Sequence, residues 1–269
     1  ERGPLSADVS FLTKALAFYR AFAEQNCDDP SSQWEIAKAY WRVGEIMPML
    51  AEGGSGDAGD GQAEAARLTA VRIWIALGER ILRNAEQGER VALAQACKRR
   101  AQICYRLGEY GKEIQYWTAS ALLNPKDPLL HNALAMALIV SPDPQFRDPP
   151  RAMRSARRGL ELQPDHAGII NTLGAAQYYA GQWQAAIESL HRSDALENYK
   201  GSAYNGFFLA MAYWQIGQQD QARTWYGKAL TWMEKNGPES EDLLRFRAEA
   251  ADLLGMDEQT EQKPGEAKP

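Results

Sequence analysis

The sequence contains few of the residues from which chemical sites are usually built. Its 269 residues include only three cysteines and three histidines. Three cysteines give no disulfide framework and suit a reducing compartment, so we expect a cytoplasmic protein. Cys97 and Cys104 stand two helical turns apart without further ligands at metal spacing, which favours buried free thiols over a zinc site. We therefore expect no metal, no cofactor and no enzymatic activity.

Excess positive charge, long apolar runs and alternating β-branched runs are also lacking. The formal net charge is −5, which argues against nucleic-acid binding because the phosphate backbone attracts an excess of Lys and Arg. No apolar run approaches the roughly 20 residues of a membrane span, and no signal peptide is visible. Helix formers dominate instead and predict an all-α chain without nucleic-acid or membrane partners. Because the chain begins with Glu1, we expect a piece of a longer protein.

One pattern is written twice between residues 167 and 230. The copies read AGIINTLGAAQYYAGQWQAAIESLHRSDAL and AYNGFFLAMAYWQIGQQDQARTWYGKAL. In each copy a leucine precedes a small residue (Leu173-Gly174 and Leu209-Ala210), and an alanine follows about three helical turns later. A glycine between them, Gly181 or Gly217, marks the end of the first helix. This layout predicts two amphipathic helices joined by a tight turn, with axes that cross closely at the small residues.

These residues resemble the tetratricopeptide repeat, in which helical hairpins recur with a period near 34 residues. Ala101 and Ala135 occupy the same place in two earlier copies and are separated by that period. The resemblance implies a right-handed α-solenoid of helical hairpins with an extra N-terminal helix and a C-terminal capping helix. Over residues 1–256 we expect a helix at 6–25, repeats at about 31–85, 89–125, 128–164, 167–199 and 203–235, and a capping helix at 239–254, followed by a disordered tail at 257–269.

Two stretches are predicted to interrupt the helices. Residues 52–62, EGGSGDAGDGQ, indicate a flexible acidic loop after a helix that stops at Gly44. The loop formally matches G-x-G-x-x-G, but no strand precedes it and its aspartates would repel a phosphate, so we do not assign a dinucleotide site. Residues 141–150, SPDPQFRDPP, carry four prolines and predict an extended, stiff loop.

Longer stretches resemble the C-terminal repeat region of large bacterial serine/threonine protein kinases and related multidomain regulators. They include ALAFYRAFAEQNCDDP, the proline loop followed by NTLGAAQYYAGQW, and FFLAMAYWQIGQQDQARTWYGKALTWMEKN with DLLRFRAEAADLLG. The resemblance implies a region that recruits partners or substrates to a kinase. The sequence has no HRD-type loop, no DFG and no glycine-rich loop on a strand, so any kinase activity would lie outside this chain.

The first helix of each repeat is expected to line the concave side of the stack. Residues two before, and two, five and six after, the leucine of each leucine–small pair are assigned to a partner-binding groove. They are Trp34, Lys38, Trp41, Arg42, Lys98, Gln102, Tyr105, Arg106, Asn132, Met136, Ile139, Asn171, Tyr178, Tyr179, Phe207, Met211 and Trp214. Trp, Tyr, Met and Arg are typical of interfaces, and the basic residues lie in the N-terminal half. We expect a protein or peptide partner with an acidic and an apolar segment, whose backbone Asn132 and Asn171 could hydrogen-bond.

Alternative interpretations stay open for parts of this surface. Trp41, Tyr178 and Trp214 are equally explained as core residues that a neighbouring helix covers. Self-association, in which the end repeats of two copies pair, is the alternative function. The four arginines between residues 151 and 158 lie on a second helix and favour a solvated face over a phosphate site.

Overall fold

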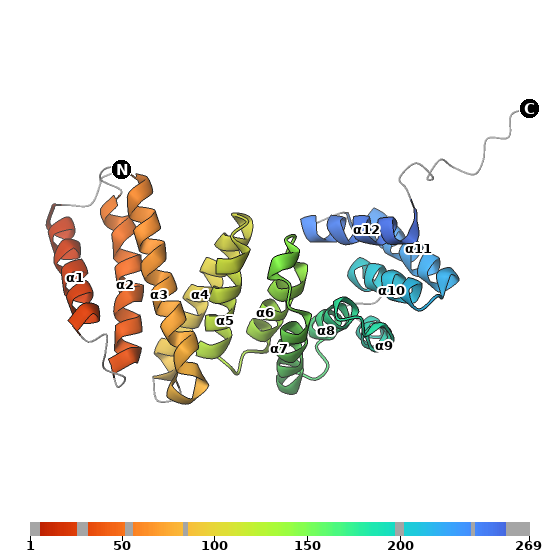
Figure 1. Ribbon diagram of the computed structural model, residues 1–269, viewed down its shortest axis with the longest axis horizontal. Coiled ribbons are helices and arrows are strands. Elements are labelled where there is room, and N and C mark those ends of the chain that lie inside the picture. Colours follow the sequence, from red (N-terminus) through yellow and green to blue (C-terminus); the bar gives the residue numbers. More distant parts are fainter. Residues whose placement is uncertain are drawn as a thin grey trace, which may run out of the picture. The chain divides into compact units, whose positions relative to one another are not determined.

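The computed structural model describes residues 6–25, 32–51, 56–82, 86–196, 202–237 and 240–256. Within these ranges every regular element is a helix, and the helices pack as consecutive hairpins (Figure 1). The predicted all-α fold is confirmed. The chain divides into two compact units, residues 1–130 and 131–269. The right-handed course of the stack and a single domain over 1–256 stay predictions, and the expected tail at 257–269 lies outside the described residues.

The first unit contains α1 to α5 and the start of α6. Their bounds are α1 (Ser6–Gln25), α2 (Gln33–Ala51), α3 (Gly56–Leu82), α4 (Gln87–Arg106), α5 (Tyr110–Leu123) and α6 (Pro128–Val140). The pairs α2–α3 and α4–α5 form hairpins, and α1 packs against α2 (Figure 1). A buried aromatic cluster joins them: the Trp41 ring centroid lies 5.4 Å from that of Trp74 and 6.4 Å from that of Tyr116. These large rings form the core of the unit.

A buried ionic cluster links the same helices. The Tyr116 hydroxyl donates a hydrogen bond to Glu64 Oε1 over 2.8 Å, and Glu64 Oε2 pairs with Arg67 and Arg100. Arg67 also donates to the carbonyl oxygen of Gly44. Burial raises the pKa of Glu64, but the hydrogen bond and charge of Arg100 outweigh it and hold that pKa below its ordinary value. Glu64 is therefore a buried carboxylate that stays ionised.

The helix predicted to stop at Gly44 does not stop there, because α2 continues to Ala51. A Cβ atom on Gly44 would lie 2.4 Å from Cγ of Arg67 and 2.7 Å from the carbonyl oxygen of Ala63. Gly44 is thus a close crossing of α2 and α3, not a helix end. The loop predicted at 52–62 is also wrong in part, since α3 begins at Gly56; residues 52–55 lie outside the described residues.

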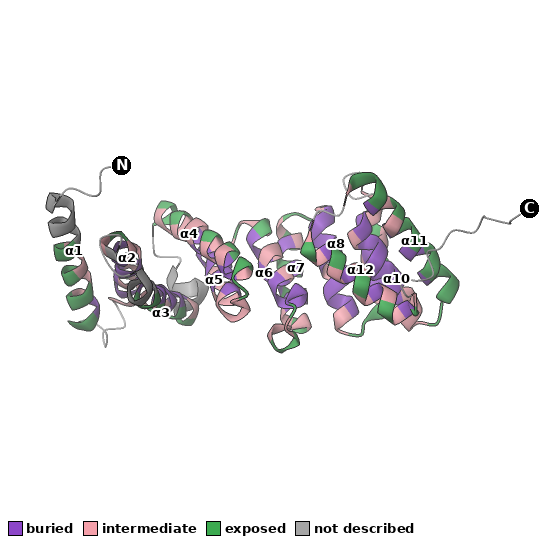
Figure 2. Cartoon of the chain, turned by 90° about the horizontal axis from the view of Figure 1, so that it is seen from above, coloured by how far each residue is buried: buried purple, intermediate pink, exposed green. Residues whose placement is uncertain are grey.

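The second unit contains the rest of α6 and the elements up to α12. Their bounds are η2 (Pro144–Phe146), α7 (Pro149–Leu162), α8 (Ala167–Tyr179), α9 (Trp183–Asp194), α10 (Ala203–Gln215), α11 (Gln219–Asn236) and α12 (Glu241–Leu254). The pairs α8–α9 and α10–α11 form hairpins, and each first helix packs on the second helix before it: α8 on α7, and α10 on α9. Figure 2 shows α8 and α10 largely buried and α11 with an exposed side.

The proline-rich stretch at 141–150 is only partly the extended loop that its composition predicts. Three of its residues form the 3₁₀ turn η2, whose N-cap Asp143 accepts a hydrogen bond from the Gln145 backbone N–H. α7 begins with Pro149 and Pro150. Proline has no backbone N–H, but the N–H groups of the first helical turn have no acceptor within the helix, so no helical hydrogen bond is lost. Asp148 caps that helix by accepting from the Arg151 backbone N–H over 3.0 Å.

The hairpin turns confirm the role predicted for Gly181 and Gly217, and Gly108 has the same role in the α4–α5 turn. Gly108, Gly181 and Gly217 have φ angles of 72°, 72° and 80°, and in each turn the glycine N–H donates to the carbonyl three residues earlier. This left-handed conformation closes the first helix of the hairpin. Gly174 marks a close crossing as expected, because a Cβ there would lie 2.7 Å from Cγ of Leu190 on α9.

The interior of the second unit carries neutral polar groups. Asn171 donates to Oδ1 of Asn205 over 2.7 Å, and Asn205 donates to the Ser193 hydroxyl over 3.2 Å. The Ser193 hydroxyl in turn donates to the carbonyl oxygen of Ala167 over 2.9 Å. This chain of hydrogen bonds joins α8, α9 and α10 without a buried charge.

Candidate functional site

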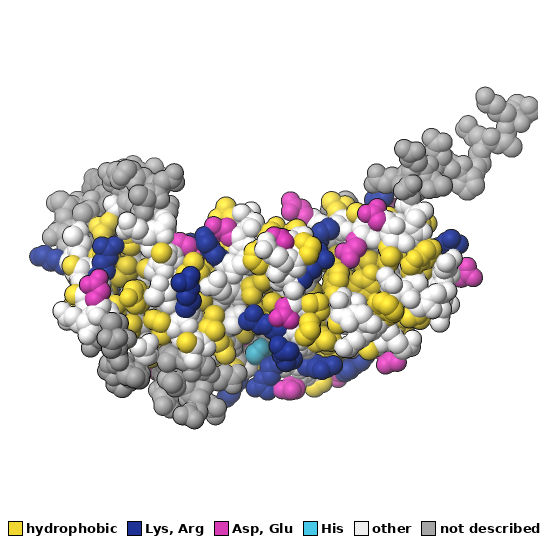
Figure 3. Space-filling view, viewed as in Figure 1, with side chains coloured by type: hydrophobic (Ala, Val, Ile, Leu, Met, Phe, Trp, Pro, Cys, Tyr) yellow, Lys and Arg dark blue, Asp and Glu magenta, His cyan; other side chains and the backbone are white. Residues whose placement is uncertain are grey.

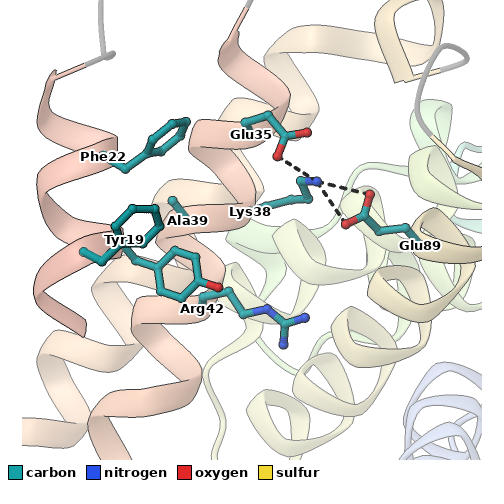
Figure 4. A pocket seen from close by; sticks show the side chains of 8 residues that line it. Tyr19, Phe22, Glu35, Lys38, Ala39, Arg42 and Glu89 are labelled. Carbon is teal, nitrogen blue, oxygen red and sulfur yellow. Dashed lines mark hydrogen bonds and ion pairs between the residues drawn. The ribbon is translucent and has the colours of Figure 1, made fainter. Parts of the chain in front are cut away.

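The first unit has a pocket of about 320 Å³ between α1, α2 and α4. Aromatic side chains of α1 form one side, and a row of mostly charged side chains forms the other (Figure 4). The lining residues are Phe18, Tyr19, Phe22, Glu35, Lys38, Ala39, Arg42 and Glu89. Two of the predicted groove residues, Lys38 and Arg42, therefore line a real hollow. The pocket combines apolar contact area with charges, as binding sites for peptides do.

Lys38 bridges α2 and α4 within this pocket. Its Nζ atom lies 2.8 Å from Oε2 of Glu35 and 3.0 Å from Oε1 of Glu89 (Figure 4). Burial lowers the pKa of Lys38, but the hydrogen bonds and charges of the two glutamates outweigh it, so that pKa lies above its ordinary value. Because two carboxylates already face Lys38, an acidic partner would gain little from it.

Phe18, Glu35 and Arg42 are the exposed residues of the pocket. The Arg42 guanidinium is exposed and pairs with Glu45 of its own helix over 2.6 Å. An exposed pair of this kind contributes about 0.5 kcal/mol or less, so Arg42 can readily exchange it for another carboxylate. The Phe18 side chain is 64% exposed and stacks on Phe22 with ring centroids 6.4 Å apart. An exposed aromatic side chain that stacks on a half-buried one beside a pocket is a typical feature of interfaces.

The other predicted groove residues of the first unit are buried in one case, Trp41, and at least partly accessible in the rest. Trp41 is buried in the aromatic core, so its assignment to the groove is wrong and the core interpretation is correct. Trp34 is half-buried, and Lys38 Nζ lies 5.7 Å from its ring centroid. The four residues of α4 remain accessible. Gln102 and Arg106 are exposed, and Lys98 and Tyr105 are half-buried.

In the second unit the corresponding surface is covered by α12. This helix packs mainly on α10 and only marginally on α11. The Phe246 ring lies 4.8 Å from that of Phe208 and 6.4 Å from that of Tyr204, both on α10. The Tyr204 hydroxyl also shares a hydrogen bond of 2.7 Å with the hydroxyl of Ser240. Since α12 lies on the first helix of its hairpin, it does not continue the stack.

α12 reaches α8 as well, through Glu249. The Tyr179 hydroxyl donates to Oε2 of Glu249 over 2.8 Å, and the guanidinium carbon of Arg147 lies 5.2 Å from the Tyr179 ring centroid. Burial and the charge of Glu249 raise the pKa of Tyr179 above its ordinary value, and they raise the pKa of Tyr178 to about 12. Both phenols therefore stay protonated, which lets Tyr179 donate to the carboxylate.

Several groove assignments in the second unit are wrong because the side chains lie in the core. Ile139, Asn171, Phe207 and Met211 are buried. Tyr178 is buried too, but on the face that α12 covers, with its ring 5.9 Å from that of Phe208. The Phe207 ring packs 5.7 Å from that of Tyr226 on α11, inside its own hairpin. Asn171 donates its side-chain amide to Asn205 inside the unit and is buried, so it does not face a peptide groove.

The remaining predicted residues of the second unit are half-buried. They are Asn132, Met136, Tyr179 and Trp214. The Oδ1 atom of Asn132 is buried and has no hydrogen-bond partner among the described residues. Whether any predicted groove residue contacts a partner stays a prediction.

Sequence reasoning missed the aromatic residues that carry these surfaces. The groove rule leaves out Phe18 and Phe22 because it counts positions only on the first helices of repeats, and α1 is expected as an extra N-terminal helix. Tyr204 and Phe208 were missed because the groove positions were counted from a single leucine. The signal was present in the run Tyr204 to Phe208, where one of two adjacent phenylalanines must face away from the hairpin interior.

Other chemistry finds little support among the described side chains. Cys97 and Cys104 are free and buried, and burial raises the pKa of Cys104 to about 11, so neither is a reactive thiolate. No group of three or more His, Cys, Asp or Glu in the described ranges is placed to hold a metal ion. No helix in these ranges is both long and apolar enough to cross a bilayer.

A basic surface lies over α7 (Figure 3). Arg154, Arg157 and Arg158 are exposed on the side opposite the buried residues of this helix. Arg158 pairs with Glu161 of its own helix over 2.7 Å. This arrangement agrees with the solvated face that the sequence favours.

Comparison with known proteins identifies one stretch of the chain directly. Residues 207–236, which cover most of α10 and all of α11, match the family model described as tetratricopeptide repeat. The TPR repeat-containing thioredoxin TDX of Arabidopsis thaliana is 27% identical over 104 residues, which are 39% of this chain and 26% of that protein. The chain thus spans about a quarter of the length of this curated relative.

Solved structures with similar folds were also found. A crystal structure of MamA has a TM-score of 0.44 at 16% identity, covering 76% of this chain and 97% of that one. TTC0263, a thermophilic TPR protein in Thermus thermophilus, has a TM-score of 0.44 at 19% identity, covering 81% and 98%. The TPR2AB domain of yeast Sti1 in complex with a pHSP90 has a TM-score of 0.37 at 16% identity, covering 83% and 81%.

Proposed function

We propose that this chain, as a tetratricopeptide repeat protein, is a non-catalytic scaffold that binds a peptide or helix of another protein. The observation that carries the proposal is the pocket between α1, α2 and α4, with Phe18 64% exposed at its edge. A protein surface rarely leaves a large aromatic side chain such as Phe18 exposed beside a hollow without a partner for it. The expected ligand inserts an apolar side chain against Phe18 and Phe22.

The charges around the pocket define the rest of the ligand. Arg42 is the cation whose present ion pair is weak, so a carboxylate of the ligand is assigned to it. Lys98 and Arg106, on α4, extend the basic character of the unit. Lys38 is excluded from this role because Glu35 and Glu89 already neutralise it. The ligand is thus a segment with an apolar anchor next to an acidic residue.

Recruitment to a bacterial serine/threonine kinase is the finer form of the proposal and rests on the sequence resemblance alone. Its test is phosphate transfer to the captured partner by the natural full-length polypeptide. A partner that binds but is never phosphorylated would remove the kinase link and leave the binding proposal standing.

Peptide display tests the binding proposal directly. Random peptides selected on the full chain should converge on an apolar residue beside Asp or Glu. We expect Phe18→Ser and Arg42→Glu each to weaken the selected peptides at least about tenfold in a titration, a change of about 1.4 kcal/mol. Arg72→Glu, an exposed arginine of α3 outside the pocket, is the matched control and should leave affinity unchanged. Selected peptides that bind Phe18→Ser and Arg42→Glu as tightly as wild type would refute the pocket.

Self-association is the alternative function, since the same exposed Phe18 could pack against a second copy. Light scattering distinguishes the two. A dimer that Phe18→Ser converts to a monomer would assign the pocket to self-association, and a monomeric wild type would exclude it.

A further inference from the structure

α12 departs from the packing rule that the rest of the second unit follows. α8 rests on α7, and α10 rests mainly on α9 and to a lesser extent on α8. A helix that merely ended the stack would rest on α11 in the same way. Instead α12 lies on α10 and reaches α8, so it occupies the face that first helices present. It lies where a ligand helix would lie.

The surface beneath α12, here called the α12-covered face, is aromatic with polar tips. It consists of Tyr178, Tyr179, Tyr204 and Phe208. An aromatic face of this kind buries an apolar helix stripe and offers hydroxyl groups to its polar residues. Arg147 lies over the Tyr179 ring, so a carboxylate at this end has both a hydrogen-bond donor and a nearby cation.

α12 shows what such a ligand must carry. Its side chains Leu243, Phe246, Ala250 and Leu254 are almost completely buried and follow the spacing i, i+3, i+7 and i+11. Glu249, at i+6, supplies the carboxylate that Tyr179 binds. Leu244 on the other side of the helix is 46% exposed and takes no part. The α12-covered face therefore binds an apolar helix stripe and one carboxylate.

The unit is built so that α12 can leave without dismantling it. The hairpins α8–α9 and α10–α11 and the packing of α10 on α9 do not involve α12. Among its polar contacts with α8 and α10, Glu249 accepts a hydrogen bond from the Tyr179 hydroxyl, and the Ser240 hydroxyl shares one with that of Tyr204. Gly237, with φ at 80°, ends α11 just before the segment that leads to α12.

We propose that the α12-covered face is a docking site for an amphipathic helix of another protein, and that α12 occupies it until that helix replaces it. The partner helix carries apolar residues at i, i+3, i+7 and i+11 and a carboxylate at i+6. The site lies wholly in the second unit and does not depend on the pocket of the first. Failure of one proposal leaves the other unaffected.

A labelled synthetic peptide of residues 240–256 is the probe, and the full chain is the receptor. We expect Phe246→Asp to expel the resident helix, because a carboxylate cannot be buried against Phe208. The expected result is that this variant binds the probe at least tenfold more tightly than wild type by fluorescence anisotropy. Leu244→Asp, on the exposed side of the same helix, is the matched control and should bind like wild type.

Conservative substitutions test the hydrogen bond between Glu249 and Tyr179. Tyr179→Phe in the Phe246→Asp chain should weaken the probe about threefold to tenfold, and so should Gln in place of Glu249 in the probe. The two changes together should cost no more than either alone, because they remove the same hydrogen bond. Additive losses would overturn the assigned contact.

Hydrogen exchange guards against a variant that merely unfolds. We expect α12 of the wild type to exchange faster than α10, and Phe246→Asp to deprotect α12 while α8 and α10 keep their protection. Equal exchange of α12 and α10, or loss of all three helices together, would show α12 to be an integral part of the fold and overturn the proposal. A wild-type dimer cross-linked from α12 of one copy to α8 of the other would overturn it in favour of exchange between copies.

Discussion

The two units use their terminal helices in opposite ways. In the first unit α1 packs beside α2 and leaves Phe18 exposed at the edge of a pocket (Figure 4). In the second unit α12 lies across α10 and brings Phe246 onto Phe208, whose side chain is then buried. The comparison teaches that the terminal helix, more than the hairpins themselves, determines whether the aromatic surface of a unit is open or filled.

The two units also differ in the charge of their buried polar groups. The first unit holds an ionised Glu64 between two arginines and Tyr116. The second unit holds Asn171 and Asn205 as a neutral pair. A buried charge is costly when its partner is lost, whereas a neutral amide costs less. The first unit should therefore be the more sensitive of the two to mutation and to pH.

The largest effect is expected at Glu64. Glu64→Ala leaves Arg67 and Arg100 without their carboxylate, and we expect the free energy of unfolding of the first unit to fall by about 3 kcal/mol. The value is at the low end for buried pairs because the Arg100 side chain keeps 29% of its exposure. Urea unfolding followed by hydrogen exchange in α3 and α4 measures it. Glu161→Ala, in the exposed pair with Arg158, is the control and should change little.

The same carboxylate should give the first unit its acid sensitivity. The pKa of Glu64 is lowered from an ordinary value of 4.5. Its contribution to stability is therefore complete above that value and is lost as the pH falls through the lower, folded-state pKa. The stability gap between wild type and Glu64→Gln should be constant above about pH 5 and narrow on acidification. A gap that stays constant down to pH 3 would contradict the ionised state of Glu64.

A smaller effect is expected from filling a helix crossing in the second unit. A Cβ on Gly206 would lie 2.7 Å from Cβ of Ala229, whereas nothing lies within 4 Å of one on Gly227. We expect Gly206→Ala to destabilise the unit by about 1 to 3 kcal/mol through overpacking. Gly227→Ala, in an exposed helix position, should stabilise it by about 0.5 to 1 kcal/mol. Thermal unfolding of both variants checks the contrast, and equal signs would contradict the crossing.

Much of the fold could be predicted because it depends on local signals. The 3.6-residue period predicts the helices, and Gly181 and Gly217 mark turns where only a residue tolerant of positive φ closes the helix. Gly44 shows the limit of this reasoning. A glycine without Cβ serves equally to end a helix and to let two helices touch, and only the Arg67 and Ala63 atoms beside it decide between them.

The candidate sites could be predicted only in part because a groove depends on helix rotation. Phe207 was assigned to the groove and Phe208 was not, yet Phe207 packs on Tyr226 and Phe208 meets α12. One residue rotates a helix by about 100°, so a count from a single leucine cannot fix the face. The capping helix at 239–254 is predicted, but its apolar stripe fits the end of a stack and the face of α10 equally well.

Because the buried polar groups of the second unit are neutral, we expect a substitution among them to lower stability by an intermediate amount that does not depend on pH. Asn205→Ala removes the acceptor of Asn171 and leaves a buried amide unpaired. We expect a loss of about 1 to 2 kcal/mol in the free energy of unfolding. The loss should be the same at pH 7 and pH 4, in contrast with Glu64→Gln. A double-mutant cycle with Asn171→Ala measures the coupling, and strictly additive losses would show that the pair does not act together.

The smallest effect on stability is expected at Arg42, the residue that the proposed function uses most. Its pair with Glu45 joins side chains that are 59% and 35% exposed, so Arg42→Gln should change the free energy of unfolding by less than about 0.5 kcal/mol. The same substitution should weaken the peptides selected on the full chain, because it removes the cation beside Phe18. Urea unfolding and peptide titration on one preparation compare the two quantities. If Arg42→Gln lost stability and affinity together, Arg42 would be a structural residue of α2 and the open pocket would lose its acidic ligand.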